Sequence, residues 1–328
     1  MLQLKELKIE AGSEPFDLDF KSAATTVVLG RNNSGKTNLL RFIAGLSTGV
    51  QGKLLLDGED ISASKPQQRP VALVVQNFVN YPNWSVEENI LSPLVNKGIS
   101  KSEQKKRARQ LASTLGLQDL INRMPNELSG GQQQRLAIAR ALAQDARVLL
   151  LDEPFVNLDY KLRETITLEL RNLFNTKDTT VIYATSNPRD AFTMGEEVLL
   201  LQDQTKLQNG PILDVYRSPK TVEAASLMSD PGVNVITVDH ELRETKPQTV
   251  VRPEHVYLAN ETGSSESERF EFKMSGSETS GDETIIHGSV YEKAWVIRRP
   301  GMIEIPARDT IDVFVHKHDL IRFPPEST

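Results

Sequence analysis

One eight-residue motif limits what this chain can fold into more than any other feature. It follows the pattern G-x-x-x-x-G-K-[ST] and consists of Gly30, Arg31, Asn32, Asn33, Ser34, Gly35, Lys36 and Thr37. The apolar run 24–29 precedes it and a helical apolar pattern at 38–44 follows, which predicts a strand, a phosphate-binding loop and a helix. In that arrangement backbone N–H groups converge at a helix N-terminus, where anions are favoured. The alternative, a glycine turn beside an exposed lysine, is disfavoured by motifs further along the chain.

Short apolar runs alternate with helical patterns along the first two thirds of the chain. They lie at 24–29, 71–75, 148–151, 180–184 and 197–201. Near-continuous apolar strands flanked by helices indicate an α/β core whose parallel sheet is covered on both faces. The stretch 84–147 is almost wholly helical in pattern, so we expect a helical subdomain inserted into that core.

The pattern changes after about residue 235. Short strand-like segments separated by turn residues predict a small all-β domain there. We therefore expect two domains, 1–235 and 236–328. The acidic, Ser/Gly-rich stretches 261–268 and 275–283 carry little apolar surface, and we expect loops at both.

Composition excludes several classes of protein. The net charge of −6 gives no electrostatic footprint for nucleic acid, and the basic run 105–109 has the spacing of a solvated helix face. There is no cysteine, so neither disulfides nor thiolate metal sites can form. No run approaches the roughly 20 apolar residues that cross a bilayer, and the N-terminus lacks the features of a secretory signal. We expect a cytosolic chain unless a partner holds it at a membrane.

Two acidic residues follow the apolar run 148–151 and, with the phosphate loop, supply the side chains needed to bind and hydrolyse ATP. Lys36 is suited to the β- and γ-phosphates of ATP, and the Thr37 hydroxyl to Mg²⁺. Asp152 is suited to holding Mg²⁺ through water, and Glu153 to orienting or deprotonating the water that attacks the γ-phosphate. Two acids at a strand end can also be helix-capping residues, but the phosphate loop supplies a use for both. The carboxyl edge of the sheet is where α/β proteins place ligands.

The stretch 128–135, Leu-Ser-Gly-Gly-Gln-Gln-Gln-Arg, resembles the signature motif of ATP-binding cassette ATPases. The resemblance implies a RecA-like cassette fold and a dimer. In that dimer this chain offers Ser129, Gly130, Gly131 and Gln132 to ATP held by the opposite subunit. Gln76 matches the family's glutamine loop, which touches Mg²⁺ and links it to the membrane subunit, and 157–159 matches the loop that crosses the dimer interface. The expected nucleotide-binding set is Gly30, Arg31, Asn32, Asn33, Ser34, Gly35, Lys36, Thr37, Asn38 and Gln76, and the expected metal set is Thr37, Gln76 and Asp152.

Two further segments narrow the resemblance to carbohydrate importers of the maltose and glycerol-phosphate type. These are 75–90, around the glutamine loop, and 251–255, Val-Arg-Pro-Glu-His. The segments 78–82, 157–164 and 183–185 most resemble one of the two ATP-binding subunits of bacterial glycerol importers. The resemblance implies a C-terminal OB-like domain for dimerisation or regulation, and two transmembrane permease subunits. It also implies an indirect periplasmic solute-binding partner and a peripheral position on the cytoplasmic face of the inner membrane.

The chain departs from the family pattern at two positions of its own nucleotide site. Ser186 stands where the family has a histidine that contacts the γ-phosphate, and serine cannot become cationic. Ala11 stands near the position where the family has an aromatic residue that stacks on adenine, and a methyl group cannot replace a ring. Phe16, nearby in sequence, is a possible substitute. We therefore predict a heterodimer in which this subunit's own site is impaired. Four alternatives stay open: neutral drift at Ser186, a scaffold with negligible turnover, an importer of another carbohydrate, and a soluble cassette ATPase acting on DNA or ribosomes. The acidic balance disfavours the last of these.

Overall fold

The chain forms two compact units, Met1–Asp214 and Val215–Thr328. The computed structural model describes residues 1–47, 49–95, 98–155, 160–174, 178–236, 248–258, 266–305 and 309–324. The predicted interface loop 157–159 and most of the expected loop 261–268 lie outside these ranges. None of the helices in the described part of the chain has the length and apolar character needed to cross a membrane.

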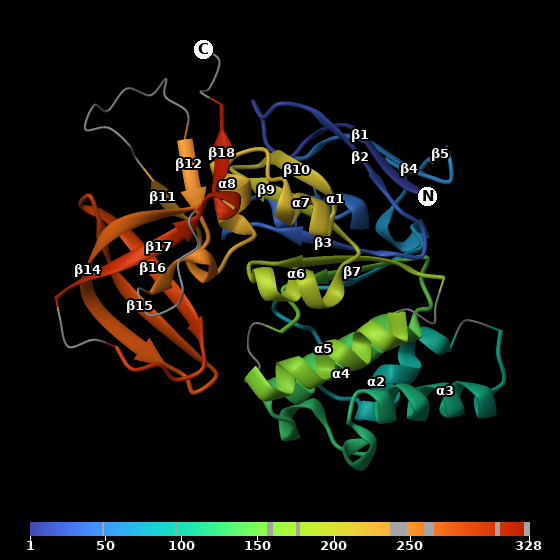
Figure 1. The fold of residues 1–328 in the computed structure, drawn as a ribbon. Helices are drawn as coiled ribbons and strands as arrows, with labels where there is room; N and C mark the ends of the chain where they lie inside the picture. The colour runs from blue at the N-terminus through green and yellow to red at the C-terminus, as the bar shows by residue number, and fades with distance from the viewer. Residues whose placement is uncertain are drawn as a thin grey trace. The chain divides into compact units, whose positions relative to one another are not determined.

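A six-stranded sheet forms the centre of the first unit (Figure 1). Its strands, in spatial order, are β10 (Thr205–Pro211), β9 (Glu197–Gln202), β3 (Thr25–Leu29), β8 (Thr180–Thr185), β7 (Val148–Asp152) and β6 (Val71–Val74). The five strands from β9 to β6 are parallel, and β10 joins β9 as an antiparallel hairpin, so the sheet is mixed rather than purely parallel. Every residue of β3, β7 and β8 is buried, as expected where both faces are covered.

A second, antiparallel sheet that the sequence analysis does not predict covers one side of this core. It contains β1 (Leu2–Lys8), β2 (Phe16–Phe20), β4 (Gln51–Leu56) and β5 (Glu59–Asp60), in the order β2-β1-β4-β5. Burial alternates along β2, so one face is apolar and the other is solvated. Apolar residues of this sheet, of α1 (Lys36–Ala44) and of the central sheet belong to one hydrophobic cluster. Helix α1, which follows the phosphate loop, is therefore fixed by packing.

The helices between β6 and β7 form a group of their own (Figure 1). They are α2 (Val86–Leu91), α3 (Lys101–Thr114) and α4 (Gly130–Ala143), with short 3₁₀ turns at Ser92–Leu94, Gln118–Leu120 and Pro125–Glu127. Helix α3 buries only Ala108 and Ala112, which leaves its basic residues largely solvated. Two more helices of the unit are α5 (Tyr160–Phe174) and α6 (Pro188–Met194), and α6 packs on β3 and β8. Helix α7 (Ile212–Arg217) begins at the end of this unit.

The described strands of the second unit form two antiparallel sheets. One contains β11 (Asn234–Ile236), β12 (Gln248–Val251) and β18 (Ile321–Phe323). The other contains β13 (Tyr257–Leu258), β17 (Thr310–His316), β14 (Ser267–Thr279), β15 (Glu283–Val290) and β16 (Lys293–Pro300). The larger sheet packs around Phe272, Trp295 and Ile297. These strands agree in part with the all-β prediction for the C-terminal region, although the unit also contains the helix Val222–Leu227, and the OB-like character stays a prediction.

Two details of the second unit differ from the sequence-based expectation. The stretch 275–283 is not a loop throughout, because 275–279 extend β14 and 276–279 pair with β15, leaving only the turn 280–282. Pairing between the strands satisfies the backbone N–H and C=O groups of this hairpin, although most of its side chains stay exposed. The contact boundary falls after Asp214 rather than 235, since Ala225 of α8 (Val222–Leu227) packs with Val250 and Phe323. The predicted functional boundary at 235 stays a prediction.

Candidate functional site

The phosphate loop joins the end of β3 to the start of α1, as its motif predicts. Asn33 and Gly35 have φ values of 63° and 104°, so the loop curls through the left-handed region twice. A Cβ at Gly30 would lie 2.4 Å from the Leu201 carbonyl oxygen and 2.3 Å from Ser34 Oγ, so only glycine fits there. The result is a tight cradle of backbone N–H groups at a helix N-terminus, a geometry suited to phosphate.

Lys36 lies inside this cradle and is only 5% exposed. Its ammonium donates to the carbonyls of Gly30 and Arg31 at 2.8 and 2.9 Å, and lies 3.2 Å from Glu153 Oε1. These partners hold the charge in place, and a phosphate oxygen would compete for the same donor. Lys36 is therefore both buried and directed at the position where a terminal phosphate is expected.

A hollow of about 560 Å³ opens over the loop. Its lining residues are Asn32, Asn33, Ser34, Gly35, Lys36, Thr37, Asn38, Gln76, Glu153, Ser186 and Gln204. Gln76, Glu153 and Ser186 follow β6, β7 and β8, so the carboxyl edge of the parallel strands brings them together. Gly30 and Arg31 do not line the hollow and contribute carbonyls to Lys36 instead.

The residues present fit a magnesium nucleotide. Ser34 Oγ is buried without a hydrogen-bond partner, a polar atom that a ligand could satisfy. Asp152 is buried and hydrogen-bonds the Thr37 side chain, and burial raises the pKa of its carboxyl despite that bond. Within the described ranges no group of three or more His, Cys, Asp or Glu could hold a metal. Hydroxyl and carboxylate oxygens with phosphate and water are the ligand set that Mg²⁺ usually takes, and bound there it would neutralise phosphate charge.

Glu153 adopts a backbone conformation that is unusual for its type. Its φ is 45°, and its N–H donates to the Ala184 carbonyl at 3.0 Å. A non-glycine residue in this region costs free energy, and such residues cluster at functional sites. The turn directs the carboxylate into the hollow beside Lys36. It can there accept a proton from, or orient, a water molecule at the terminal phosphate.

The turn that carries Ser186 is held by a buried polar network. Asp190 Oδ2 accepts from Thr185 Oγ1 at 2.7 Å, from Tyr183 Oη at 3.2 Å and from Arg163 Nη2 at 2.5 Å. Tyr183 is fully buried, which raises its pKa well above the ordinary value. Ser186 itself is exposed to the hollow, at the position where the sequence analysis expects a histidine in the family.

The signature residues lie at a different place, the N-terminus of α4. Ser129 is the N-cap and accepts from the Gln132 N–H at 3.3 Å, while the Gln132 side chain accepts from the Ser129 N–H at 2.9 Å. This reciprocal capping box leaves Ser129 and Gly130 exposed, with Gly131 partly so. None of these residues lines the hollow of its own chain. The geometry is compatible with the predicted role toward a second subunit, which stays a prediction.

The segment after Gln76 is tied to the signature helix. The Arg140 guanidinium stacks 4.1 Å from the centre of the Tyr81 ring and donates to the Val79 carbonyl. Tyr81 and Trp84 are in ring contact at 4.5 Å, yet each is 43% exposed. These aromatics are therefore anchored at one side and open at the other.

Sequence reasoning missed one residue of the hollow, Gln204. It belongs to a two-residue turn between β9 and β10, and its side chain donates to the Asn33 carbonyl at 2.7 Å. The available signal was only a polar pair after an apolar run. That signal does not indicate a phosphate site, since contact with residue 33 depends on the tertiary fold.

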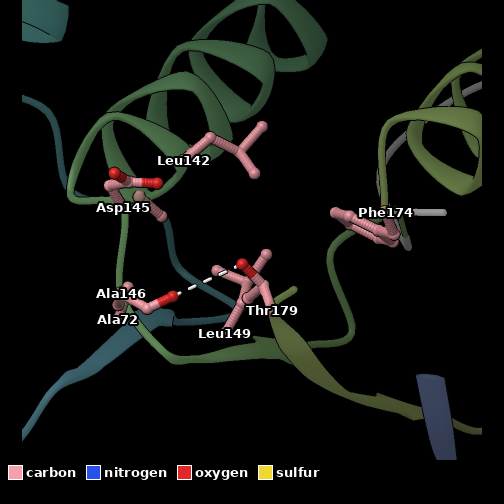
Figure 2. A pocket seen from close by; sticks show the side chains of 8 residues that line it. Ala72, Leu142, Asp145, Ala146, Leu149, Phe174 and Thr179 are labelled. Atoms are coloured by element: carbon pink, nitrogen blue, oxygen red, sulfur yellow. Dashed lines mark hydrogen bonds between the residues drawn. The ribbon is translucent and has the colours of Figure 1, made fainter. Parts of the chain in front are cut away.

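A second, much smaller pocket lies in the first unit. Figure 2 shows it between Leu142, Leu149 and Phe174, with Thr179 Oγ1 donating to the Ala146 carbonyl at 3.5 Å. Its volume is about 10 Å³, which holds at most one water molecule.

Comparisons with known proteins agree with the site. A family model described as ABC transporter matches residues 14–156. The uncharacterized ABC transporter ATP-binding protein YurJ of Bacillus subtilis is 30% identical over 95% of this chain and 93% of its own length. The sn-glycerol-3-phosphate import ATP-binding protein UgpC of Pectobacterium atrosepticum is 34% identical over 84% of this chain and 82% of its own. The spermidine/putrescine import ATP-binding protein PotA of Thermotoga maritima is 40% identical over 68% of this chain and 62% of its own length.

A solved structure extends this likeness to three dimensions. The ATP-binding cassette MJ0796, in a dimeric post-hydrolysis state bound to ADP and Pi, is 28% identical. It superposes with a TM-score of 0.58 and covers 64% of this chain and 98% of its own. Because relatives of at least 30% identity align over nearly the whole chain, and the cassette fold carries an intact phosphate loop, the chain belongs to the ABC transporter family, as one of its ATP-binding ATPase subunits.

Proposed function

We propose that this subunit energises a carbohydrate-type bacterial importer, for glycerol or a related small polyol or sugar. The resemblance of 75–90 and 251–255 to such importers supports this. Similarity to the UgpC protein of Bordetella avium spans 98% of the chain, while that to the PotA proteins spans 68% and 74%. Likeness to the glycerol-phosphate group thus includes the second unit.

The hollow over the phosphate loop is the observation that carries the ATP-dependent part of this proposal. Lys36 would bind the terminal phosphates of ATP, and Thr37, Asp152 and Gln76 would hold Mg²⁺. Glu153 orients the attacking water, and Ser186 contacts the γ-phosphate without supplying a charge. Each of these side chains lines the hollow or bonds a residue that does.

The chain works in a heterodimer, and its own site is the weaker of the two. Ser186 compensates developing negative charge less well than an imidazolium would. The loop that contains Ala11 has no aromatic residue for adenine, and Phe16 is buried at 9% exposure with Lys206 Nζ 5.5 Å from its ring centre. The exposed signature around Ser129 serves the partner's nucleotide.

The remaining partners are two transmembrane permease subunits, with a periplasmic solute-binding protein acting through them. The exposed surface of Tyr81 and Trp84, anchored to α4 by Arg140, is suited to contact a permease subunit. This places the chain on the cytoplasmic face of the inner membrane, and the second unit serves dimerisation or regulation.

The test is a comparison of two variants in the complex that co-purifies with the tagged chain. Lys36→Ala disables this chain's site, and Ser129→Ala disables the partner's site. We expect Ser129→Ala to lower ATP turnover by at least about tenfold and Lys36→Ala to lower it less than about twofold. Equal losses, or rapid turnover by the chain alone, would refute the asymmetric heterodimer. Co-purification without any transmembrane permease subunit would refute the importer assignment.

A scaffold role is the second candidate, and the Lys36–Glu153 contact favours it, since that pair occupies both groups with each other. An experiment with isotopically labelled ATP separates the scaffold role from active hydrolysis. The chain is incubated with the labelled ATP, and the nucleotide that it traps is then analysed. Intact ATP in wild type indicates a scaffold, whereas ADP that disappears in Lys36→Ala indicates active hydrolysis.

A further inference from the structure

Gln204 lies in a hairpin turn whose backbone angles are unusual for glutamine. Asp203 and Gln204 form the two-residue turn between β9 and β10, with φ values of 48° and 63°. Glycine adopts such angles at little cost, whereas glutamine does not. The turn at Tyr291 and Glu292 has similar angles, 48° and 64°, between β15 and β16. What distinguishes Gln204 among these residues is that it lines the hollow over the phosphate loop.

Three hydrogen bonds fix Gln204 against the phosphate loop and the start of α1, two of them through its side-chain amide. Its Nε2 donates to the Asn33 carbonyl at 2.7 Å, and its Oε1 accepts from Asn38 Nδ2 at 3.4 Å. Its backbone N–H donates to the Ser34 carbonyl at 3.1 Å. A primary amide has two N–H donors and two acceptor lone pairs, so one donor and one acceptor remain for a ligand.

Strand order places Gln204 at the end of the hollow opposite the catalytic side chains. The loop follows β3, and β8, β7 and β6 lie on one side of it. Ser186 and Glu153 follow β8 and β7, so the terminal phosphate is expected on that side. Gln204 follows β9, on the other side of β3.

The loop that contains Ala11 lies on the same side as Gln204. A Cβ at Gly35 would lie 2.8 Å from Gln204 Oε1 and 3.1 Å from Ile9 Cγ2, so both residues pack against one point of the phosphate loop. Ile9 begins the connection from β1 to β2 that includes Ala11. If the terminal phosphate lies on the β8 side and adenine lies beside Ala11, as the resemblance implies, the sugar between them is expected near Gln204.

We propose that Gln204 is a nucleotide-binding residue whose amide hydrogen-bonds the ribose hydroxyls. A hydroxyl both donates and accepts, which matches the free donor and acceptor of the amide. This contact would supply part of the nucleotide affinity that an aromatic residue at the position of Ala11 would otherwise provide. The inference rests on the proposed nucleotide site around Lys36 and adds the recognition of its sugar.

The experiment measures the dissociation constants of the full chain for ATP, 2′,3′-dideoxy-ATP and tripolyphosphate. Wild type should bind ATP about three- to tenfold more tightly than the dideoxy analogue, and Gln204→Gly should bind the two equally. Tripolyphosphate has no ribose, so its affinity should be the same in both proteins. Asp203→Gly, the matched control in the same turn, should keep the wild-type preference.

Several results would overturn the inference. One is a wild type without preference for ATP over the dideoxy analogue, and another is a preference that survives in Gln204→Gly. A parallel loss of tripolyphosphate binding in Gln204→Gly would show that the residue only shapes the loop. Lys36→Ala tests the underlying site separately, because it should weaken all three ligands. If Lys36→Ala binds them as wild type does, the proposed nucleotide site itself is wrong.

Discussion

The buried carboxylate behind Ser186 gives the sharpest prediction about stability. Asp190 is 5% exposed, and its Oδ2 accepts from Arg163, Tyr183 and Thr185. Asp190→Ala removes the carboxylate that pairs with Arg163 and leaves the Tyr183 hydroxyl buried without its acceptor. We expect this variant to lower the free energy of unfolding of the first unit.

The magnitude follows from the burial of both partners. The side chains of Arg163 and Asp190 are 23% and 7% exposed. Breaking a buried ion pair by removing one partner costs about 3–5 kcal/mol, because the remaining charge loses its compensation. That is a large part of the roughly 5–15 kcal/mol that stabilises a typical domain. Removing Arg163 as well should restore about 1–3 kcal/mol, since neither charge is then left alone.

The assay is urea denaturation followed by far-ultraviolet circular dichroism, because most of the described helices lie in the first unit. Arg107→Ala is the matched control, since the Arg107–Glu103 pair is 43% and 42% exposed and should cost less than about 0.5 kcal/mol. A loss below about 1 kcal/mol for Asp190→Ala, or a double variant no more stable than the single one, would refute the reasoning.

Four further predictions concern activity, stability and pH. Ser186→His should raise the chain's own ATP turnover about tenfold or more by supplying a cationic partner for the γ-phosphate, and unchanged phosphate release would contradict this. Arg69→Met should lower the free energy of unfolding by about 2–4 kcal/mol, because the buried guanidinium donates to four backbone carbonyls, two of them at the end of α1. A denaturation midpoint equal to that of wild type would exclude this role. Burial raises the pKa of Tyr216 from 10.0 to about 12, so between pH 10 and 12 the folded state keeps a proton that the unfolded chain loses. The free energy of unfolding should therefore fall as pH rises through that window. Denaturation at several pH values should show a smaller fall in Tyr216→Phe. Arg140→Met should leave turnover by the chain alone unchanged and weaken its stimulation in the assembled complex, and equal stimulation would argue against the Tyr81 surface as a docking site.

The phosphate loop was predictable from sequence because its geometry is local. Residues 30–37 form a cradle from consecutive backbone groups, and the apolar run before them and the helix after them fix its setting. The capping box of Ser129 and Gln132 is equally local, since it closes within one helical turn. The joint position of Glu153 and Ser186 was also foreseeable, because parallel strands end at one edge of the sheet.

Other elements depend on partners that are distant in sequence. The sheet of β1, β2, β4 and β5 escaped prediction because β1 pairs with β4 across the whole phosphate loop and α1. The extension of β14 beyond residue 274 was predicted as loop, since its side chains stay exposed and only pairing with β15 makes it a strand.

The sequence by itself determined that this chain holds a nucleotide phosphate, since the loop and the helix after it are encoded in neighbouring residues. Only the tertiary structure decided what surrounds that phosphate. Gln204 reaches Asn33 across 171 positions, and Arg163 reaches Asp190 across 27. Such contacts leave no periodic trace in the sequence, because they form only when packed strands and helices bring the two side chains together.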